Sequence, residues 1–338
     1  MPKCALDIKL EKEGKCYKTD EKIKGRVYVS VDKICQCEKL TIELFWRTHG
    51  LGNKDTGPKI TLALFEGNWD PGTHHYDFEF TIPNSPRTYV GESVNIDWYL
   101  CARADIPWIF DPKIEVDFTV TPNINYRRDS ASIFADFRTN KEYLSSFNDN
   151  KQYNFLPVIS LGIFCLGLIV LTRAMFSMSL GGLVFGSLML LGTFSTAKFF
   201  VKQHIAFRKL GVVGLEINQP NFYPGERLNF KLKFSPKADI QINHISAQLV
   251  LEETAISGSG TSGSRHKRFI EGTKKRFDGP FLFYSGGTFE KSGELQIADH
   301  SIHSFQSDNN SLLWYLNIAI DINQWPDFDK KESIIVLN

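Results

Sequence analysis

The sequence predicts a mainly β protein in which a two-helix membrane hairpin separates two antiparallel β-sandwiches. Three observations lead to this fold class. Short runs of alternating apolar residues fill both ends of the chain, two long uncharged runs fill its middle, and aromatic residues make up 13% of its 338 residues. Aromatic side chains suit the half-buried surface of a sheet, and this length allows two domains. We expect sandwiches at 1–122 and 208–338, a juxtamembrane linker at 123–152 and the hairpin at 153–200.

The strands are expected where apolar alternation is bounded by turn residues. In the first half, the clearest runs are at 27–31, 40–46, 60–65 and 76–82. Several short strands at this spacing, with no helical period between them, are typical of an antiparallel, immunoglobulin-like sandwich. The same pattern returns in the second half at 228–234, 245–251 and 333–337.

The middle of the chain is long and apolar enough to cross a membrane twice. Residues 155–172 carry no charge, and after Arg173 the stretch 174–197 carries none. A helix needs about 20 such residues to span the hydrocarbon core, and 153–154 complete the first run. The alternative is a buried helical hairpin in a soluble core, but such helices normally keep a polar stripe. Two spans, joined by a short turn at 173–179, are therefore expected.

Basic residues at the ends of these runs predict the orientation of the protein. They flank the outer ends of the hairpin, whereas the turn holds only Arg173; the flanking residues are Arg138, Lys141, Lys151, Lys198, Lys202, Arg208 and Lys209. Because Lys and Arg are retained on the cytoplasmic side, both termini and both sandwiches are expected there. The protein would then be a multi-pass integral membrane protein, with the lipid bilayer as one partner.

Two shorter patterns accompany the hairpin. Gly182 and Gly186 form a Gly-x-x-x-Gly spacing, which allows close contact either within the hairpin or between two copies in a homo-oligomer. Residues 130–144 place Ile133, Phe134 and Phe137 among polar residues, which predicts a short amphipathic helix leading to the membrane.

The two halves also resemble each other. Trp98-Tyr99-Leu100 precedes an Asp-Ile pair and Trp108, while Trp314-Tyr315-Leu316 precedes a second Asp-Ile pair and Trp325. Two further matches occur in the same order: Tyr17, Asp20-Glu21 and Ile23 with Tyr223, Gly225-Glu226 and Leu228, and Leu40 and Leu44 with Ile245 and Leu249. These coincidences predict a tandem duplication.

Several sequence motifs of this chain resemble those of the arrestin family. Its first half typically has a Gly-x-His-x-Phe-x-Phe strand leading into a Pro, followed by an aromatic pair; the matching residues are Gly72, His74, Tyr76, Phe78, Phe80, Pro83, Trp98 and Tyr99. The turn at 223–226 looks like the one that opens the second arrestin half. The resemblance spans roughly 5–122 and 210–337 and implies two tandem arrestin-like sandwiches that bind protein partners at a membrane.

The chain departs from the family in two respects. A membrane hairpin replaces the short linker between the halves, and a Pro-Pro-x-Tyr ligase-recruiting motif is absent from the sequence. The resemblance therefore does not carry receptor desensitisation or ligase recruitment over to this chain.

No catalytic, metal or cofactor site is expected. Cys35 and Cys37 are two residues apart, and a role as small core residues is favoured over half of a metal site. The Gly-rich stretch at 48–53 opens no helix, which favours a hairpin loop over a phosphate cradle. The neighbours His74 and His75 would point to opposite faces of a strand. Asp105 and Asp111 have no nucleophile beside them, and Asp105 has a counterpart in Asp321, so a turn-forming role of Asp105 is favoured over acid/base chemistry.

Composition and charge exclude other functions. The net charge of +1 argues against nucleic-acid binding, and without an apolar leader the six cysteines are expected to be reduced thiols in the cytosol. A flexible stretch at 257–264 leads into a local basic cluster, which either binds anionic lipid or is a solvated part of a hairpin loop. The cluster comprises Arg265, Lys267, Arg268, Lys274, Lys275 and Arg276.

Together these patterns predict a membrane-tethered adaptor that binds unidentified protein partners at the cytoplasmic face. The alternative is a membrane-anchored enzyme or transport accessory protein in which the sandwiches only position an active partner. A cleft with converging titratable groups would favour the enzyme, and exposed sheet edges would favour the adaptor.

Overall fold

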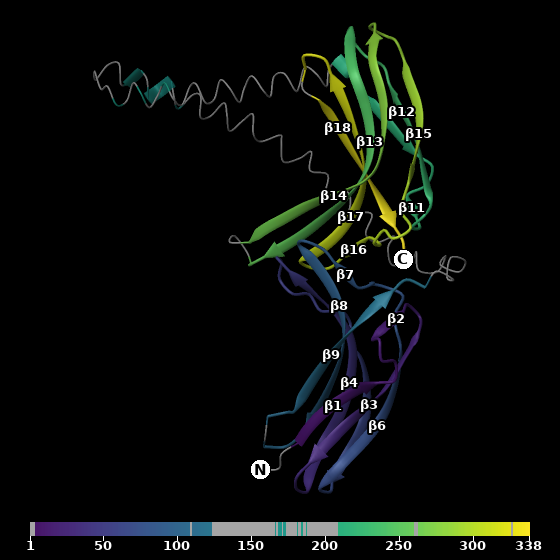
Figure 1. Ribbon diagram of the computed structural model, residues 1–338. Helices are drawn as coiled ribbons and strands as arrows, with labels where there is room; N and C mark the ends of the chain where they lie inside the picture. The colour runs from purple at the N-terminus through teal and green to yellow at the C-terminus, as the bar shows by residue number, and fades with distance from the viewer. Residues whose placement is uncertain are drawn as a thin grey trace.

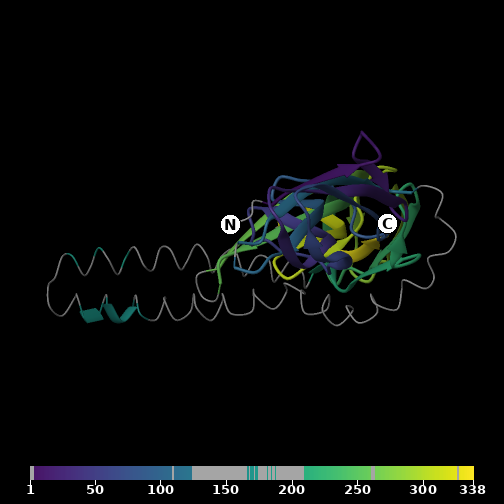
Figure 2. The same cartoon turned by 90° about the horizontal axis from the view of Figure 1, so that it is seen from below.

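The structure is a computed structural model that describes residues 4–123 except 109, residues 209–338 except 260–262 and 326, and scattered positions between 166 and 187. Figure 1 shows two β domains stacked end to end in an elongated body, with the first domain in purple and blue and the second in green and yellow. Seen along the long axis, the two domains overlap (Figure 2).

The first domain is a sandwich of a small and a large sheet. The small sheet has the order β1-β3-β6, with β1 (Cys4–Leu10), β3 (Lys22–Val31) and β6 (Gly72–Thr81). The large sheet has the order β2-β9-β8-β4-β5, with β7 paired to β8; its strands are β2 (Cys16–Lys18), β4 (Cys35–Gly50), β5 (Ile60–Trp69), β7 (Tyr89–Val90), β8 (Val94–Asp105) and β9 (Lys113–Thr121).

The second domain repeats this topology strand for strand. Its small sheet has the order β10-β12-β15, with β10 (Val213–Ile217), β12 (Arg227–Phe234) and β15 (Phe289–Gln296). Its large sheet has the order β11-β18-β17-β13-β14, with β16 paired to β17; its strands are β11 (Asn221–Phe222), β13 (Ile240–Ser257), β14 (Ser264–Phe283), β16 (Phe305–Gln306), β17 (Asn310–Ile322) and β18 (Phe328–Val336).

Equivalent side chains make equivalent contacts in the two domains, as a duplication requires. The indole N–H of Trp98 donates to the carbonyl of Pro86 at 2.8 Å, and that of Trp314 donates to Ile302 at 2.9 Å. One expected match is wrong by a residue: the buried counterpart of Tyr17 is Phe222, because both lie on the short parallel strands β2 and β11.

Alternating burial along the strands builds the core of each sandwich. Along β17 every second residue is buried, and β3 shows the same period, as expected for strands with one face against a partner sheet. Glycines make room for aromatic rings across the small sheets. Gly25 pairs with Phe78, and Gly293 pairs with Phe230, and in each pair a Cβ on the glycine would collide with the ring.

All the strand runs predicted from sequence lie within or largely within observed strands, which confirms the mainly β prediction for the described residues. The prediction of a loop is wrong for 264–276, because these residues form part of the twenty-residue strand β14. Of the flexible stretch expected at 257–264, Ser257 and Ser264 lie in strands, and 260–262 lie outside the described residues. The register of β14 against β13 holds this basic stretch extended.

The linker expected at 123–152 lies outside the described residues except for Asn123, and so does most of the hairpin expected at 153–200, including Gly182 and Gly186. The positions described between 166 and 187 are helical, and Leu168 and Ile169 among them are exposed. Among the described residues, no helix has the length and apolar character needed to cross a membrane. The spans therefore remain a prediction from sequence.

Candidate functional site: the junction between the two sandwiches

The largest cluster of buried polar side chains in the described chain lies where the two sandwiches meet. It involves the β4–β5 connection and the segment around β7 in the first domain, and the β13–β14 hairpin and the β16–β17 turn in the second (Figure 1). Three groups of contacts make up this junction.

The first group surrounds Asp55, which is 7% exposed. Its carboxylate accepts hydrogen bonds from the Ser307 hydroxyl at 2.5 Å, from the backbone and side-chain N–H of Asn309 at 2.9 and 2.6 Å, and from the Asn310 amide at 2.8 Å. All the donors come from the second domain. Burial alone would raise the pKa of Asp55, but these hydrogen bonds outweigh burial and lower it. Asp55 is thus ionised, and uncharged hydrogen-bond donors of the second domain hold its carboxylate in place.

The loop next to Asp55 adds backbone contacts. The Asn53 N–H donates to the carbonyl of Ile256 at 2.7 Å, and the Asn53 side chain both donates to and accepts from Gly258. Gly52 permits this approach, since a Cβ there would lie 2.7 Å from the side-chain oxygen of Asn310. The Gly-rich stretch is therefore a strand connection, as predicted, and it also docks on the second domain.

The second group surrounds Glu253, a fully buried carboxyl group on β13. It accepts hydrogen bonds from the Tyr89 hydroxyl at 2.5 Å and from the Ser93 backbone N–H at 2.8 Å, both in the first domain. Burial, followed by the adjacent Glu253, raises the pKa of Tyr89. Gly91 lies against the Glu253 carboxyl, where a Cβ would collide with it. Only glycine fits at position 91.

The third group is a buried arginine. Arg87, 4% exposed, donates to the carbonyl of Ser301 at 3.0 Å and to Nδ1 of His303 at 3.4 Å. Burial, with a smaller contribution from the Arg87 cation, lowers the pKa of His303 to about 3. His303 is thus neutral near pH 7, which lets its Nδ1 accept from the guanidinium.

Apolar packing continues through the same junction. Val94 and Ile96 of β8 belong to the buried core cluster of the second domain, and Trp46 meets Phe305 edge to face at a centroid distance of 5.3 Å. A shared core, together with buried hydrogen bonds, makes relative domain motion costly. The two sandwiches therefore form one body.

The structure places the predicted basic residues along β14, where several of them form ion pairs. Lys267 pairs with the buried Glu252 at 2.9 Å, Arg276 pairs with Asp278 at 2.6 Å, and Arg268 reaches across the junction to Glu92 at 2.5 Å. Arg265, Lys274 and Lys275 are exposed. These residues lie on an edge strand, along which successive side chains point to opposite faces. Their binding to anionic lipid stays a prediction from sequence.

The other chemistry-bearing residues have structural roles. Cys35 and Cys37 are buried core residues of β4, and burial raises the pKa of the Cys37 thiol to about 12. Asp111 accepts hydrogen bonds from the Arg103 side chain and from the Ile106 N–H, and these contacts close the β8–β9 loop. The part of the chain that the structure describes contains no cluster of metal-ligating side chains.

The three buried charged residues of the junction were not predicted from sequence; they are Asp55, Arg87 and Glu253. One signal could have found Glu253, since two adjacent carboxylates, Glu252 and Glu253, interrupt the apolar run of β13, where a carboxyl group is buried only with partners. Asp55 gives no such signal, because its burial depends on a turn more than 250 residues away.

Comparison with known proteins agrees with this architecture in the first domain. Residues 64–127 match the family model described as arrestin (or S-antigen), N-terminal domain. Among curated proteins, none matches the chain. The matched segment runs from β5 through β9 and contains Arg87, Tyr89 and Ser93 of the junction, whereas Asp55 and the loop beside it precede the segment. Residues 64–127 are therefore similar to an arrestin N-terminal domain, and that similarity suggests an adaptor or scaffold role.

Proposed function

We propose that the protein is a membrane-tethered, arrestin-like adaptor whose two sandwiches act as one rigid body and bind protein partners at the cytoplasmic face of a membrane. The observation that carries this proposal is the buried junction, which fixes two sandwiches of the same topology end to end. The uncharged runs around 155–197 supply the tether. Such a scaffold presents surfaces in a fixed relation, as an adaptor needs to.

Exposed sheet edges supply the partner sites in this proposal. The strands β5 and β14 are edges of the two large sheets, and both views show the β13–β14 hairpin projecting from the body (Figures 1 and 2). An extended peptide can add as a strand to such an edge. Leu62 on β5 and Phe269 on β14 are 37% and 51% exposed, and both offer apolar contact beside the edge.

The enzyme alternative finds less support. An open groove of about 560 Å³ lies over β10, β12 and β15 and contains Glu294 and Lys231. These two side chains pair with strand neighbours, Glu294 with Arg227 at 3.0 Å and Lys231 with Glu290 at 2.7 Å. Their charges do not converge on a common point as general acid/base chemistry requires.

Site-specific crosslinking tests the edge assignment. A photoreactive amino acid placed at Leu62 or Phe269 in the full-length protein is expected to give discrete protein adducts in intact cells. The same residue at Lys24, on the outer face of the small sheet, serves as control. Adducts that form equally at all three positions, or at Lys24 alone, would contradict binding at the edges.

A further inference from the structure

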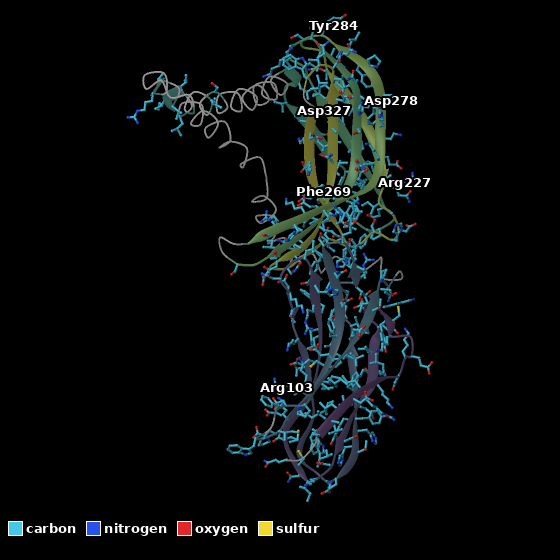
Figure 3. All side chains as sticks on the ribbon, turned by 60° about the vertical axis from the view of Figure 1, so that its left-hand side comes forward. Arg103, Arg227, Phe269, Asp278, Tyr284 and Asp327 are labelled. Atoms are coloured by element: carbon cyan, nitrogen blue, oxygen red, sulfur yellow. The ribbon has the colours of Figure 1, made fainter. Side chains whose placement is uncertain are left out.

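The end of the second sandwich farthest from the first domain carries exposed apolar side chains. Val212, Leu282 and Tyr284 are 83%, 68% and 75% exposed. Figure 3 shows Tyr284 at the extreme end of the molecule, while Arg103 lies in the opposite half. We call the surface formed by residues 209–212, 235–239 and 282–288 the distal end.

Hydrogen bonds hold these three segments together as one surface. The Lys237 N–H donates to the carbonyl of Lys209 at 2.7 Å, and the Gly286 N–H donates to Pro236 at 2.9 Å. Ser285 donates its N–H to the Asp239 carboxylate at 2.8 Å. The apolar side chains therefore project from a rigid base, which lowers the conformational entropy lost when they bind another surface.

The distal end also combines aromatic and basic groups. The Lys209 ammonium lies 4.1 Å from the centre of the Trp325 ring, and Lys237 is exposed beside it. In the sequence, Lys198, Lys202 and Arg208 lead directly into this surface. Tyr and Trp with flanking Lys and Arg are the residues enriched where proteins meet lipid headgroups.

Chain length ties this end to the apolar middle of the protein. Only twelve residue steps separate Ala197, where the second uncharged run stops, from Lys209. Fully extended, they span at most about 43 Å, and about 18 Å if helical. By contrast, the 30 residue steps from Asn123 to Tyr153 can span about 100 Å and place little constraint on the first domain.

We propose that the distal end of the second sandwich docks on the headgroup layer of the bilayer that holds residues 153–200, with Val212, Leu282 and Tyr284 inserted among the lipids. This inference rests on the proposed membrane tether and adds an orientation to it. The long axis of the body then points away from the membrane, and the first sandwich is the part farthest out.

The opposite end of the molecule offers a matched control. Trp108 and Phe110, in the β8–β9 loop, are 95% and 101% exposed, more than Val212, Leu282 or Tyr284 of the distal end. If exposure of apolar side chains alone decided lipid contact, this loop would insert first. Because the junction makes the two sandwiches one body, a molecule that stands on its distal end holds this loop away from the same membrane.

Lipid quenching of a fluorophore tests the docking. The full-length chain, with Cys4, Cys16 and Cys165 replaced by Ser, is labelled with bimane at a cysteine replacing Tyr284 or Trp108 and reconstituted into vesicles of phosphatidylcholine and phosphatidylserine. Brominated acyl chains are expected to quench the label at 284 at least twofold more than the label at 108. Adding Val212→Ser and Leu282→Ser should reduce the quenching at 284 about twofold.

Extraction of the same vesicles with alkaline carbonate distinguishes failure of the docking from failure of the membrane tether. Protein that stays in the vesicles with equal or absent quenching at 284 and 108 overturns the docking and leaves the tether intact. Release of the protein by carbonate overturns both the tether and the docking, because the distal end is held near the bilayer only if the segment before Lys209 is inserted. Stronger quenching at 108 than at 284 overturns the docking by reversing the orientation.

Discussion

Replacing Asp55 by Ala is expected to uncouple the two sandwiches and to lower the free energy of unfolding by about 3 kcal/mol. The carboxylate accepts four hydrogen bonds from the second domain, and Ala accepts none. Hydrogen bonds to a charged group are stronger than neutral ones. Ser307 and Asn310 keep secondary acceptors, so the cost stays below the sum of four bonds.

Hydrogen exchange of the full-length protein measures this uncoupling. Exchange of the turn at 307–310 should rise on the order of 100-fold in the variant, following the expected loss of about 3 kcal/mol. Asp77→Ala is the control, because Asp77 is 72% exposed and pairs with Arg26 inside the first domain. Unchanged exchange at 307–310 in the Asp55 variant would contradict the role of this carboxylate.

The same carboxylate predicts how the coupling depends on pH. The pKa of Asp55 lies below its ordinary value of 3.8 in the folded protein. Its stabilisation is therefore complete above about pH 4 and is lost as pH falls through the lowered pKa. The difference in stability between wild type and Asp55→Ala should stay constant from pH 5 to 8 and shrink only in stronger acid.

Glu253→Ala is expected to cost about 2 to 4 kcal/mol, because it leaves the buried Tyr89 hydroxyl and Ser93 N–H without their acceptor. Thermal unfolding of the full-length protein should then show a lower midpoint, with the first domain losing protection around β7. Glu92→Ala is the matched control. That carboxylate also bridges the junction, but it is 64% exposed and its pair with Arg268 contributes less than about 1 kcal/mol. Equal losses in both variants would contradict the role assigned to burial.

The fold could be predicted from sequence wherever a strand has one buried face. Apolar and polar residues alternate at 27–31 and 228–234 because the inner face of each strand packs on a partner sheet. The matching positions of Trp98 and Trp314 indicated the duplication. Strand β14 escaped prediction for the opposite reason. It is an edge strand with water on most of both faces, so Lys274, Lys275 and Arg276 follow one another without alternation.

The junction could not be predicted because it depends on tertiary contacts. Asp55 and Arg87 look like surface residues until the second domain covers them. Their donors and acceptors, Asn309 and Ser301, lie more than 200 residues away. Local pattern carries no information about such pairs, whereas the adjacent Glu252 and Glu253 inside an apolar strand do signal a buried polar contact.

A rigid junction also bears on how an adaptor of this kind would work. Partners on β5 and β14 would be held in a fixed relation, and variants at Asp55 or Glu253 would loosen that relation without touching either edge. Loss of partner recruitment in those variants would link the buried contacts to function.

The most direct test of the central claim is where the intact chain partitions. Full-length protein, expressed with residues 153–200 unaltered, is extracted from membranes with alkaline carbonate, and protease sites at its two ends are probed in sealed vesicles. The proposed tether predicts that the protein stays in the pellet and that both ends are cleaved from the same side. Release into the supernatant, or cleavage of the two ends from opposite sides, would contradict it.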